Sequence, residues 1–422
     1  MNLSEYLAKK IEQLGIDFFY GGIDEDKSKT ILAIKKNTDL KYVSCNSEKN
    51  AFYAAMGYAN IKGFGTVYLN SQNAAFDMIA TIKECYDNNI PIILIVEVSD
   101  IKSLNAKADN DLYLSIFNEV LNTVVCLNRD NAKIEIDRMI KNIVNDKKPI
   151  YLAIPENVFD MEIPYRELDF DNSLLLCNKK DFSDDGVFIE DPVHKNIAEN
   201  CYGNEINLIS LCNKLRKFIS KTDILLIDSN FNNNIIDIFA DSDKTNFYYS
   251  NLKSWGIPAV LGSYCADFRN KTMLITDVEA FEQSAFEIKN ILSYGYKPVI
   301  LLLNQKNKDN DIQIDYMRFI RIFSGETWAT KVDNVNDIEK ALRVTQIINK
   351  LCIIEIIINE ENLIYNNNDL SEDTAKNIIL KNDAENITKL TTDTIKLTNE
   401  EIVLNKNISY ATHIHTSLKE LE

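Results

Sequence analysis

The chain has 422 residues, 45% of them hydrophobic and 26% charged, which is typical of a soluble globular protein long enough for two or three domains. Its formal net charge of −17 at pH 7 argues against a nucleic-acid partner, because an acidic surface repels a phosphate backbone. No apolar run approaches the roughly 20 residues that span a bilayer, and the amphipathic N-terminus is unlike a signal peptide, so we expect no membrane partner and a cytoplasmic location.

Helical and strand patterns alternate through the first 165 residues. A helix is predicted over residues 1–15, ending at Gly15, and is followed by a strand at 16–20 and an acidic turn at 24–26. The later segments of this half follow the same alternation: helices near 29–36, from 48 onward, at 74–86 and at 134–144, and strands at 42–45, 67–69, 92–98 and 149–154. Apolar strands that alternate with helices indicate a parallel sheet covered on both faces.

A second unit with the same alternation begins after a polar stretch. Its predicted helices cover 206–219, a segment opening at Trp255 and Gly256, and 281–292, and its strands cover 223–227, 272–275 and a run led by Pro298. We therefore predict an α/β protein with two doubly wound parallel-sheet domains. The expected divisions are a first domain at 1–165, a linker at 166–204, a second domain at 205–360 and a polar C-terminal tail at 361–422.

The stretch from Val43 to Gly65 carries the clearest motif. A short strand is followed by Asn46 and Ser47, either of which can cap a helix that begins near Glu48. Alanines at 51, 54, 55 and 59 make one side of this helix thin, so it can pack closely against a neighbour. Glu48 would lie beyond the carboxyl end of a strand, which is where open α/β sheets bind ligands.

The pattern Asn-x-Glu-x-Asn-Ala-x-Tyr-Ala-Ala-x-Gly-Tyr-Ala resembles the pyrimidine-binding domain of the thiamine diphosphate-dependent 2-oxo-acid decarboxylases, such as the pyruvate and indolepyruvate decarboxylases. The second half is similar to the diphosphate-binding domain of that family, most clearly at Trp255-Gly256 and from Tyr294 to Asn304. The resemblance implies the thiamine diphosphate-binding fold in both domains. The 166–204 linker is too short to hold the middle domain of the full-length enzymes.

The resemblance also implies functional residues in the first domain. Glu48 matches the carboxyl group that activates the cofactor's aminopyrimidine ring, a role for which burial must raise its pKa. Glu25 matches the acidic residue that handles protons, with Asp24 and Asp26 as alternatives. The family's His-His pair is missing: the matching region reads Leu-Asn-Ala-Lys-Ala-Asp, where Lys107 is more readily explained as a solvated surface residue.

In the second domain the resemblance points to the diphosphate and magnesium clamp. Asp277, Asn304 and Gln305 match cofactor-binding positions, with Asp277 and Gln305 as the candidate Mg²⁺ ligands. Both glycines of the family's Gly-Asp-Gly segment are absent, and Val278 follows the aspartate directly. Because phosphate needs close approach of bare backbone, these departures indicate a vestigial site, and a cap after a strand also explains Asp277.

Three interpretations remain open. The first is a non-catalytic homologue without a cofactor, retained as a self-associating scaffold subunit. In the family the cofactor lies between domains of two subunits, so the resemblance implies an interface for a dimer or a larger homo-oligomer. The second is a minimal thiamine diphosphate- and Mg²⁺-dependent carboxy-lyase with Glu48 as activator and Glu25 or Asp311 as proton relay. The third is a binding module for another ligand in the former cleft. The loss of several cofactor-facing segments favours the first.

Overall fold

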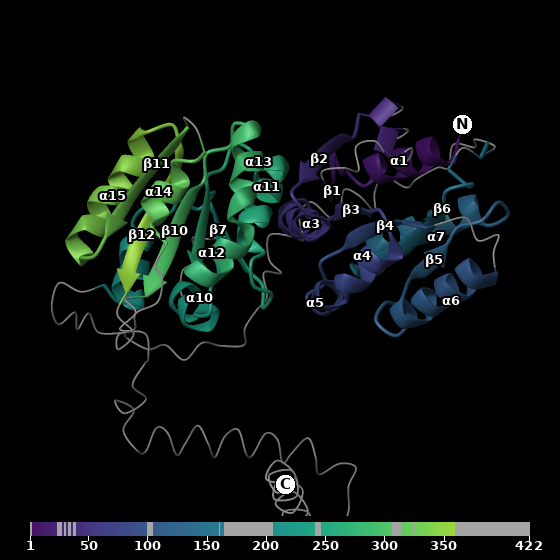
Figure 1. Ribbon diagram of the computed structural model, residues 1–422, viewed down its shortest axis with the longest axis horizontal. Helices are drawn as coiled ribbons and strands as arrows, with labels where there is room; N and C mark the ends of the chain where they lie inside the picture. The colour runs from purple at the N-terminus through teal and green to yellow at the C-terminus, as the bar shows by residue number, and fades with distance from the viewer. Residues whose placement is uncertain are drawn as a thin grey trace, which may run out of the picture. The chain divides into compact units, whose positions relative to one another are not determined.

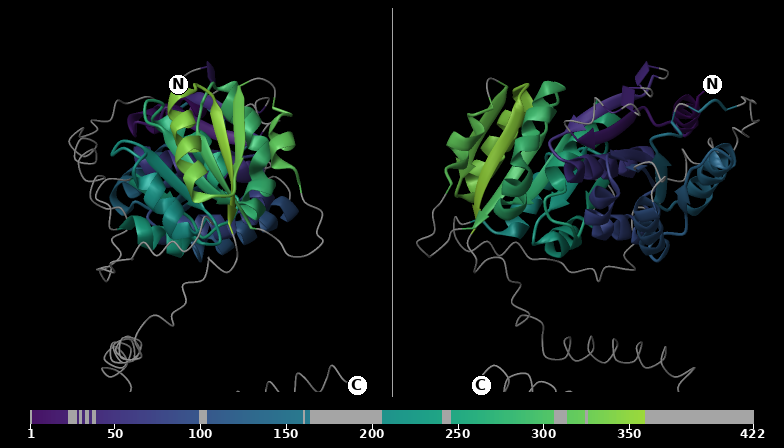
Figure 2. Two further views of the ribbon diagram at one scale, coloured as in Figure 1. Left: turned by 90° about the vertical axis from the view of Figure 1, so that its left-hand side faces the viewer. Right: turned by 45° about the vertical axis from the view of Figure 1, so that its right-hand side comes forward.

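The computed structural model describes residues 2–22, 28, 31–32, 35–36, 39–98, 104–159, 161–163, 206–240, 246–305, 314–323 and 326–358. Within them the chain forms two six-stranded sheets, and every strand pairing is parallel. Helices cover both faces of each sheet (Figures 1 and 2). The predicted fold class is confirmed.

The first sheet has the strand order β2-β1-β3-β4-β6-β5. Its strands are β1 (Phe18–Gly22), β2 (Lys41–Cys45), β3 (Gly65–Leu69), β4 (Ile92–Val98), β5 (Val124–Cys126) and β6 (Ile150–Pro155). The helices that accompany them are α1 (Leu3–Gln13), α3 (Glu48–Lys62), α4 (Gln72–Asp77), α5 (Ile79–Asp87), α6 (Leu104–Asn118) and α7 (Ala132–Asp146).

The second sheet repeats this arrangement, because its order read from β8 is β8-β7-β9-β10-β12-β11. Its strands are β7 (Ile224–Asp228), β8 (Asn246–Tyr249), β9 (Thr272–Asp277), β10 (Val299–Gln305), β11 (Thr327–Val332) and β12 (Leu351–Ile358). Its helices are α9 (Leu208–Arg216), α10 (Asn232–Ala240), α11 (Gly256–Ala266), α12 (Val278–Ser284), η2 (Ala285–Glu287), α13 (Ile288–Ser293), α14 (Tyr316–Ile320) and α15 (Val335–Ile347). In each sheet the strand order reverses beside the first strand, so each carboxyl edge has a topological switch point.

The predicted elements that lie in the described residues agree with the observed ones to within a few residues, except that two predicted helices are divided. Helices α6, α10, α14 and α15 and strands β5, β8, β11 and β12 were not predicted from the sequence. The helix predicted over 74–86 is divided at Met78 into α4 and α5, and the helix predicted over 281–292 is divided into α12, η2 and α13. The helix predicted near 29–36, the linker at 166–204 and the tail at 361–422 lie wholly or mainly outside the described residues. The domain divisions therefore stay predictions.

Helices α3 and α11 join the two sheets through small residues. A β-carbon added at Gly57 would lie 2.3 Å from the carbonyl oxygen of Ala259, so this contact requires glycine. One apolar core accordingly continues from the first sheet through α3 and α11 to one face of the second sheet, and a separate cluster covers the other face. The sequence predicted that the thin alanine side of α3 packs closely against a neighbour, and within this chain that neighbour is α11.

Candidate functional site

A small pocket lies at the carboxyl edge of the second sheet, at its switch point. Strands β7 and β9 are neighbours there, and they end at Asp228 and Asp277. The pocket encloses about 210 Å³. It is lined by residues at or just beyond the ends of β7, β8 and β9: Asp228, Ser229, Asn230, Ser250, Asn251, Leu252, Lys253, Asp277 and Ala280. The sequence predicted Asp277 at this edge and missed Asp228, although an aspartate that ends an apolar strand is a visible signal.

The carboxylate of Asp277 accepts two backbone hydrogen bonds. Its Oδ1 accepts from the N–H of Ala280 at 2.9 Å, so Asp277 is the N-cap of α12. Its Oδ2 accepts from the N–H of Asn230 at 2.7 Å. The side chain is 8% exposed. The cap explains why a helix starts immediately at Val278, where the family resemblance calls for glycine.

The carboxyl group of Asp228 makes a similar contact with the next helix. Its Oδ2 accepts from the N–H of Gly256, the first residue of α11, at 2.8 Å. A side chain at Gly256 would clash, because its β-carbon would lie 2.7 Å from the β-carbon of Asp228. Trp255 fixes the start of the helix by donating from its buried indole to the carbonyl of Ile227 at 3.3 Å. The Trp-Gly motif thus positions an N–H group against a carboxylate.

Burial raises the pKa of Asp228 to about 7, opposed by the Gly256 hydrogen bond and assisted by the negative charge of Asp277. The side chain is 2% exposed. Lys49 of α3 contributes a smaller stabilisation of the charged form. Asp228 is therefore a carboxyl group that exchanges a proton near neutral pH.

The mouth of the pocket holds a cation that is already paired. The Lys253 ammonium lies 2.7 Å from a carboxylate oxygen of Glu279, which also accepts from the Asn230 side chain at 3.4 Å. The lining therefore presents two acidic groups, and its one lysine is neutralised by a third carboxylate.

The predicted ligands Asn304 and Gln305 end the neighbouring strand β10. The side-chain amide of Asn304 donates to Glu355 of β12 at 2.7 Å, and Lys331 of β11 lies 3.4 Å from the same carboxylate. Gln305 is half-buried at the strand end. Glu355 was missed by sequence reasoning, although a single acidic residue within the apolar run Leu351–Ile358 marks a group that needs internal partners.

Glu48 lies at the carboxyl edge of the first sheet, as predicted from its place after β2. Ser47, not Asn46, caps α3 by accepting from the N–H of Asn50. Glu48 is half-buried, and its Oε1 accepts from the N–H of Asn70, which follows β3, at 2.9 Å. Its role as an activating acid stays a prediction. Glu25 and Asp311 lie outside the described residues, as does the side chain of Lys107.

A second acidic residue at this edge escaped the sequence analysis. Glu97 of β4 accepts from the hydroxyl of Tyr68 of β3, and Ser28 donates to the same carboxylate at 3.1 Å. Tyr68 is buried beneath this edge. The hydroxyl–carboxylate pair is adjacent to the strand end that precedes Asn70, so polar groups from β3 and β4 gather there.

Two carboxylates connect the halves of the chain that carry the two sheets. Glu287 of η2 is fully buried and accepts from the N–H of Asn46 at 3.0 Å and from the side chain of Asn50 at 2.8 Å. Conversely, Glu84 of α5 accepts from the hydroxyl of Ser250 and from the N–H of Asn251, the latter at 2.9 Å. The switch-point pocket is therefore built partly on a loop that the first domain holds.

Comparison with known proteins agrees with this architecture. Residues 1–116 match the family described as thiamine pyrophosphate enzyme, N-terminal TPP binding domain. Pyruvate decarboxylase 2 of Nicotiana tabacum is 29% identical over 192 residues, which cover 42% of this chain and 31% of that protein. Pyruvate decarboxylase of Hanseniaspora uvarum is 24% identical over 179 residues, or 40% of this chain and 32% of that protein. This chain is a relative of the thiamine diphosphate-dependent decarboxylases.

The likeness is strongest in fold. The solved thiamine diphosphate-dependent 4-hydroxybenzoylformate decarboxylase of Rhodococcus jostii RHA1 superposes with a TM-score of 0.66 over 86% of this chain and 100% of that chain, at 10% sequence identity. Both sheets thus have the doubly wound thiamine diphosphate-binding fold. The matched segments amount to about a third of the length of the pyruvate decarboxylases.

At the switch-point pocket the residues present do not fit the diphosphate that this family implies. Three N–H groups around the pocket, those of Asn230, Gly256 and Ala280, are the donors that a bound anion would use, and each is already taken by Asp228 or Asp277. Among the described residues, no three His, Cys, Asp or Glu side chains gather as a metal site, and the predicted Mg²⁺ ligands Asp277 and Gln305 stay a prediction.

None of the helices in the described part of the chain is both long enough and apolar enough to cross a bilayer.

Proposed function

We propose that this chain is a non-catalytic relative of the thiamine diphosphate-dependent decarboxylases, in which two of its own carboxyl groups replace the cofactor's phosphates. The observation that carries the proposal is the pairing of Asp228 and Asp277 with the N–H groups of Gly256, Asn230 and Ala280. Each of these side chains takes one N–H group at the start of a helix, so a diphosphate would meet negative charge and compete with a cap there.

The retained fold then serves as a scaffold. The α3–α11 contact, Glu287 and Glu84 hold the two halves of the chain together through contacts within the chain itself. This packing does not require an open cleft, because the contacts are between side chains and backbone of the chain itself. We infer that the chain folds into a stable two-domain subunit.

Self-association of this subunit is supported by exposed apolar side chains above an aromatic cluster whose other rings, Phe319 and Phe323, are half-buried and buried. Phe286 is 61% exposed and makes edge-to-face contacts with Phe319 and Phe323, at ring separations of 5.7 and 6.3 Å. Ile322 beside them is 57% exposed. Contiguous exposed apolar side chains of this kind are typical of protein–protein contacts.

Calorimetry and thermal unfolding with thiamine diphosphate and Mg²⁺ test the absence of cofactor binding. We expect no saturable heat and no stabilisation up to millimolar cofactor, whereas binding at ten times Kd would stabilise the fold by about 1.4 kcal/mol. Stabilisation that is lost in Glu48→Gln would overturn the proposal and support a minimal carboxy-lyase. Stabilisation by an unrelated metabolite in the same pocket would instead support a binding module.

Sedimentation velocity over a range of protein concentrations tests the self-association. We expect concentration-dependent assembly that Phe286→Ser weakens. Phe268→Ser is the matched control, because Phe268 is 73% exposed and makes no ring contact with that cluster in the described structure. A monomer at all concentrations, or an equal effect of both variants, would contradict this part of the proposal.

A further inference from the structure

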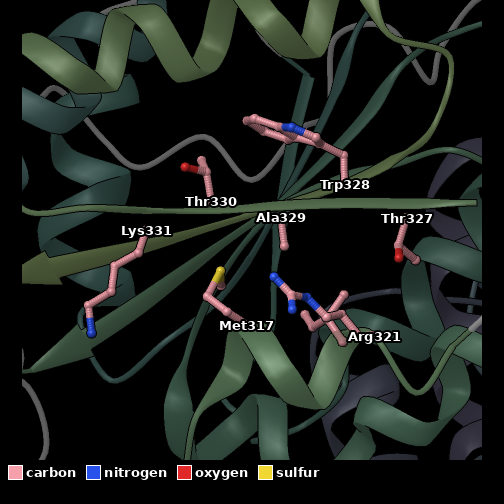
Figure 3. Close-up of a pocket in the computed structure, with 8 residues that line it drawn as sticks. Met317, Arg321, Thr327, Trp328, Ala329, Thr330 and Lys331 are labelled. Atoms are coloured by element: carbon pink, nitrogen blue, oxygen red, sulfur yellow. The ribbon is translucent and has the colours of Figure 1, made fainter.

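A second and larger pocket lies at the opposite end of the second sheet from the switch point, between α14 and β11. It encloses about 390 Å³, within the range of small-molecule sites. Its lining residues are Met317, Ile320, Arg321, Thr327, Trp328, Ala329, Thr330 and Lys331. Figure 3 shows the side chains of Arg321 and Lys331 on the same side of β11 as Met317, with Trp328 and Thr330 on the other side.

The two cations of the pocket differ in their partners. Lys331 lies 3.4 Å from the buried carboxylate of Glu355, so its charge is largely compensated. The backbone N–H of Arg321 donates to the carbonyl of Arg318 at 3.1 Å, but its guanidinium, which is exposed, has no hydrogen bond or ion pair within the described part of the chain. Arg318, three residues earlier on the same helix, is 85% exposed and pairs with Asp315 at 3.1 Å. An arginine that lines a pocket without a partner presents a planar fork that matches a carboxylate or phosphate.

The backbone of β11 adds hydrogen-bonding groups to this pocket. Among the described strands β11 ends the sheet, and it pairs with β12 alone. The carbonyl of Glu326 accepts from the N–H of Leu351, and in a parallel ladder alternate residues direct both polar groups to the same neighbour. Trp328 and Thr330 therefore continue the series toward β12, which leaves the N–H and C=O of Ala329 on the open side.

Beside the two cations and the hydroxyl groups of Thr327 and Thr330, the pocket has an apolar wall. Ile320 is buried, Met317 is half-buried, and both come from α14 below the strand, beside the methyl group of Ala329. A ligand that uses this surface needs a hydrophobic body next to its anionic group. This combination separates the pocket from a simple phosphate site, which would be surrounded by donors.

We propose that the α14–β11 pocket binds a small carboxylate with an apolar chain or ring. Arg321 holds the carboxylate, Met317 and Ile320 contact the apolar part, and the open edge at Ala329 supplies further hydrogen bonds. The site is separate from the switch-point pocket and does not depend on whether the chain binds thiamine diphosphate.

Titration of the full chain with 4-phenylbutyrate tests this assignment, with 4-phenylbutyramide as the neutral probe and inorganic phosphate as the anion without an apolar body. Binding is followed by calorimetry and by the ¹³C-methyl signal of Met317, assigned through Met317→Leu. We expect low-millimolar affinity for a ligand of this size, with the carboxylate at least tenfold tighter than the amide.

Arg321→Gln should weaken 4-phenylbutyrate at least tenfold, whereas the matched variant Arg318→Gln should change the affinity less than twofold. Equal losses in both variants would show a general charge effect and overturn the assignment. Equal affinity for acid and amide, tighter binding of inorganic phosphate, or no response of the Met317 methyl group at 20 mM ligand, roughly ten times the expected Kd, would each overturn it as well.

Discussion

Gly262 of α11 lies against the backbone of Ala54 of α3 so closely that a β-carbon there would be 1.8 Å from the Ala54 carbonyl oxygen. The opposing position, Gly57, meets Ala259 in the same way. This reciprocal use of glycine sets the distance between the helices, and with it the distance between the two sheets. Neither contact can relax by rotation of a side chain, because the nearest atoms belong to the backbone.

Gly262→Ala should therefore destabilise the protein by at least about 2 kcal/mol, because the helices must separate to admit one methyl group. Urea unfolding measures the free energy of unfolding. Lys141→Ala on the exposed side of α7 is the control and should change it by less than about 0.5 kcal/mol. A Gly262→Ala variant of native stability would show that α3 and α11 do not pack as described.

Glu287→Ala should destabilise the protein by roughly 3 kcal/mol or more, because it leaves the Asn46 N–H and the Asn50 and Asn290 amides without their acceptor in a buried site. Glu287→Gln keeps the shape and should cost less. Glu326→Ala provides the comparison, because the Glu326 side chain is 64% exposed and makes a long ion pair, at 3.9 Å, with Lys297. Equal unfolding free energies for Glu287→Ala and Glu326→Ala would rule out a buried acceptor role.

Asp277→Ala should lower the free energy of unfolding by about 1–3 kcal/mol, because α12 loses its cap and the Asn230 N–H loses its acceptor. Asp315→Ala removes a cap from α14 at a position that is 53% exposed and should cost less. Added Mg²⁺ should leave the wild-type stability unchanged, as expected for a cap. A magnesium-dependent increase that Asp277→Ala abolishes would instead identify Asp277 as a metal ligand.

The stability of the protein should depend on pH through Asp228. Its folded-state pKa of about 7 is above the ordinary value of 3.8, so the folded protein holds this proton more tightly than the unfolded chain does. The stabilisation of the folded state by this proton is fully present below about pH 4 and is lost as pH rises through about 7. The free energy of unfolding should fall by up to roughly 4 kcal/mol over this range.

Asp228→Asn should therefore flatten the fall in unfolding free energy between pH 4 and 7, measured by urea unfolding at several pH values. The unfolding free energy of the variant should exceed that of the wild type most clearly near pH 8. Asp130→Asn, at an exposed position, should follow the wild-type curve. Parallel curves for Asp228→Asn and the wild type would contradict a proton held in the buried site.

The sequence by itself determined the two parallel sheets, because apolar strands such as Ile92–Val98 can be buried on both faces only beneath helices. It also placed Glu48 and Asp277 at strand ends, since these positions depend on local patterns and caps. The motif around Glu48 was enough to indicate the family, which the comparisons support.

Only the tertiary structure decided what the polar residues contact. Asp228 and Glu355 end or interrupt apolar strands in the sequence, but their partners, Gly256 and Asn304, are distant along the chain and are brought together by strand order. The sequence indicated that the thin side of α3 packs closely against another element. It did not indicate that this element is α11, because residues 54 and 262 meet only through folding. Hydrogen bonds and helix contacts at such separations depend on topology, which a local pattern does not contain.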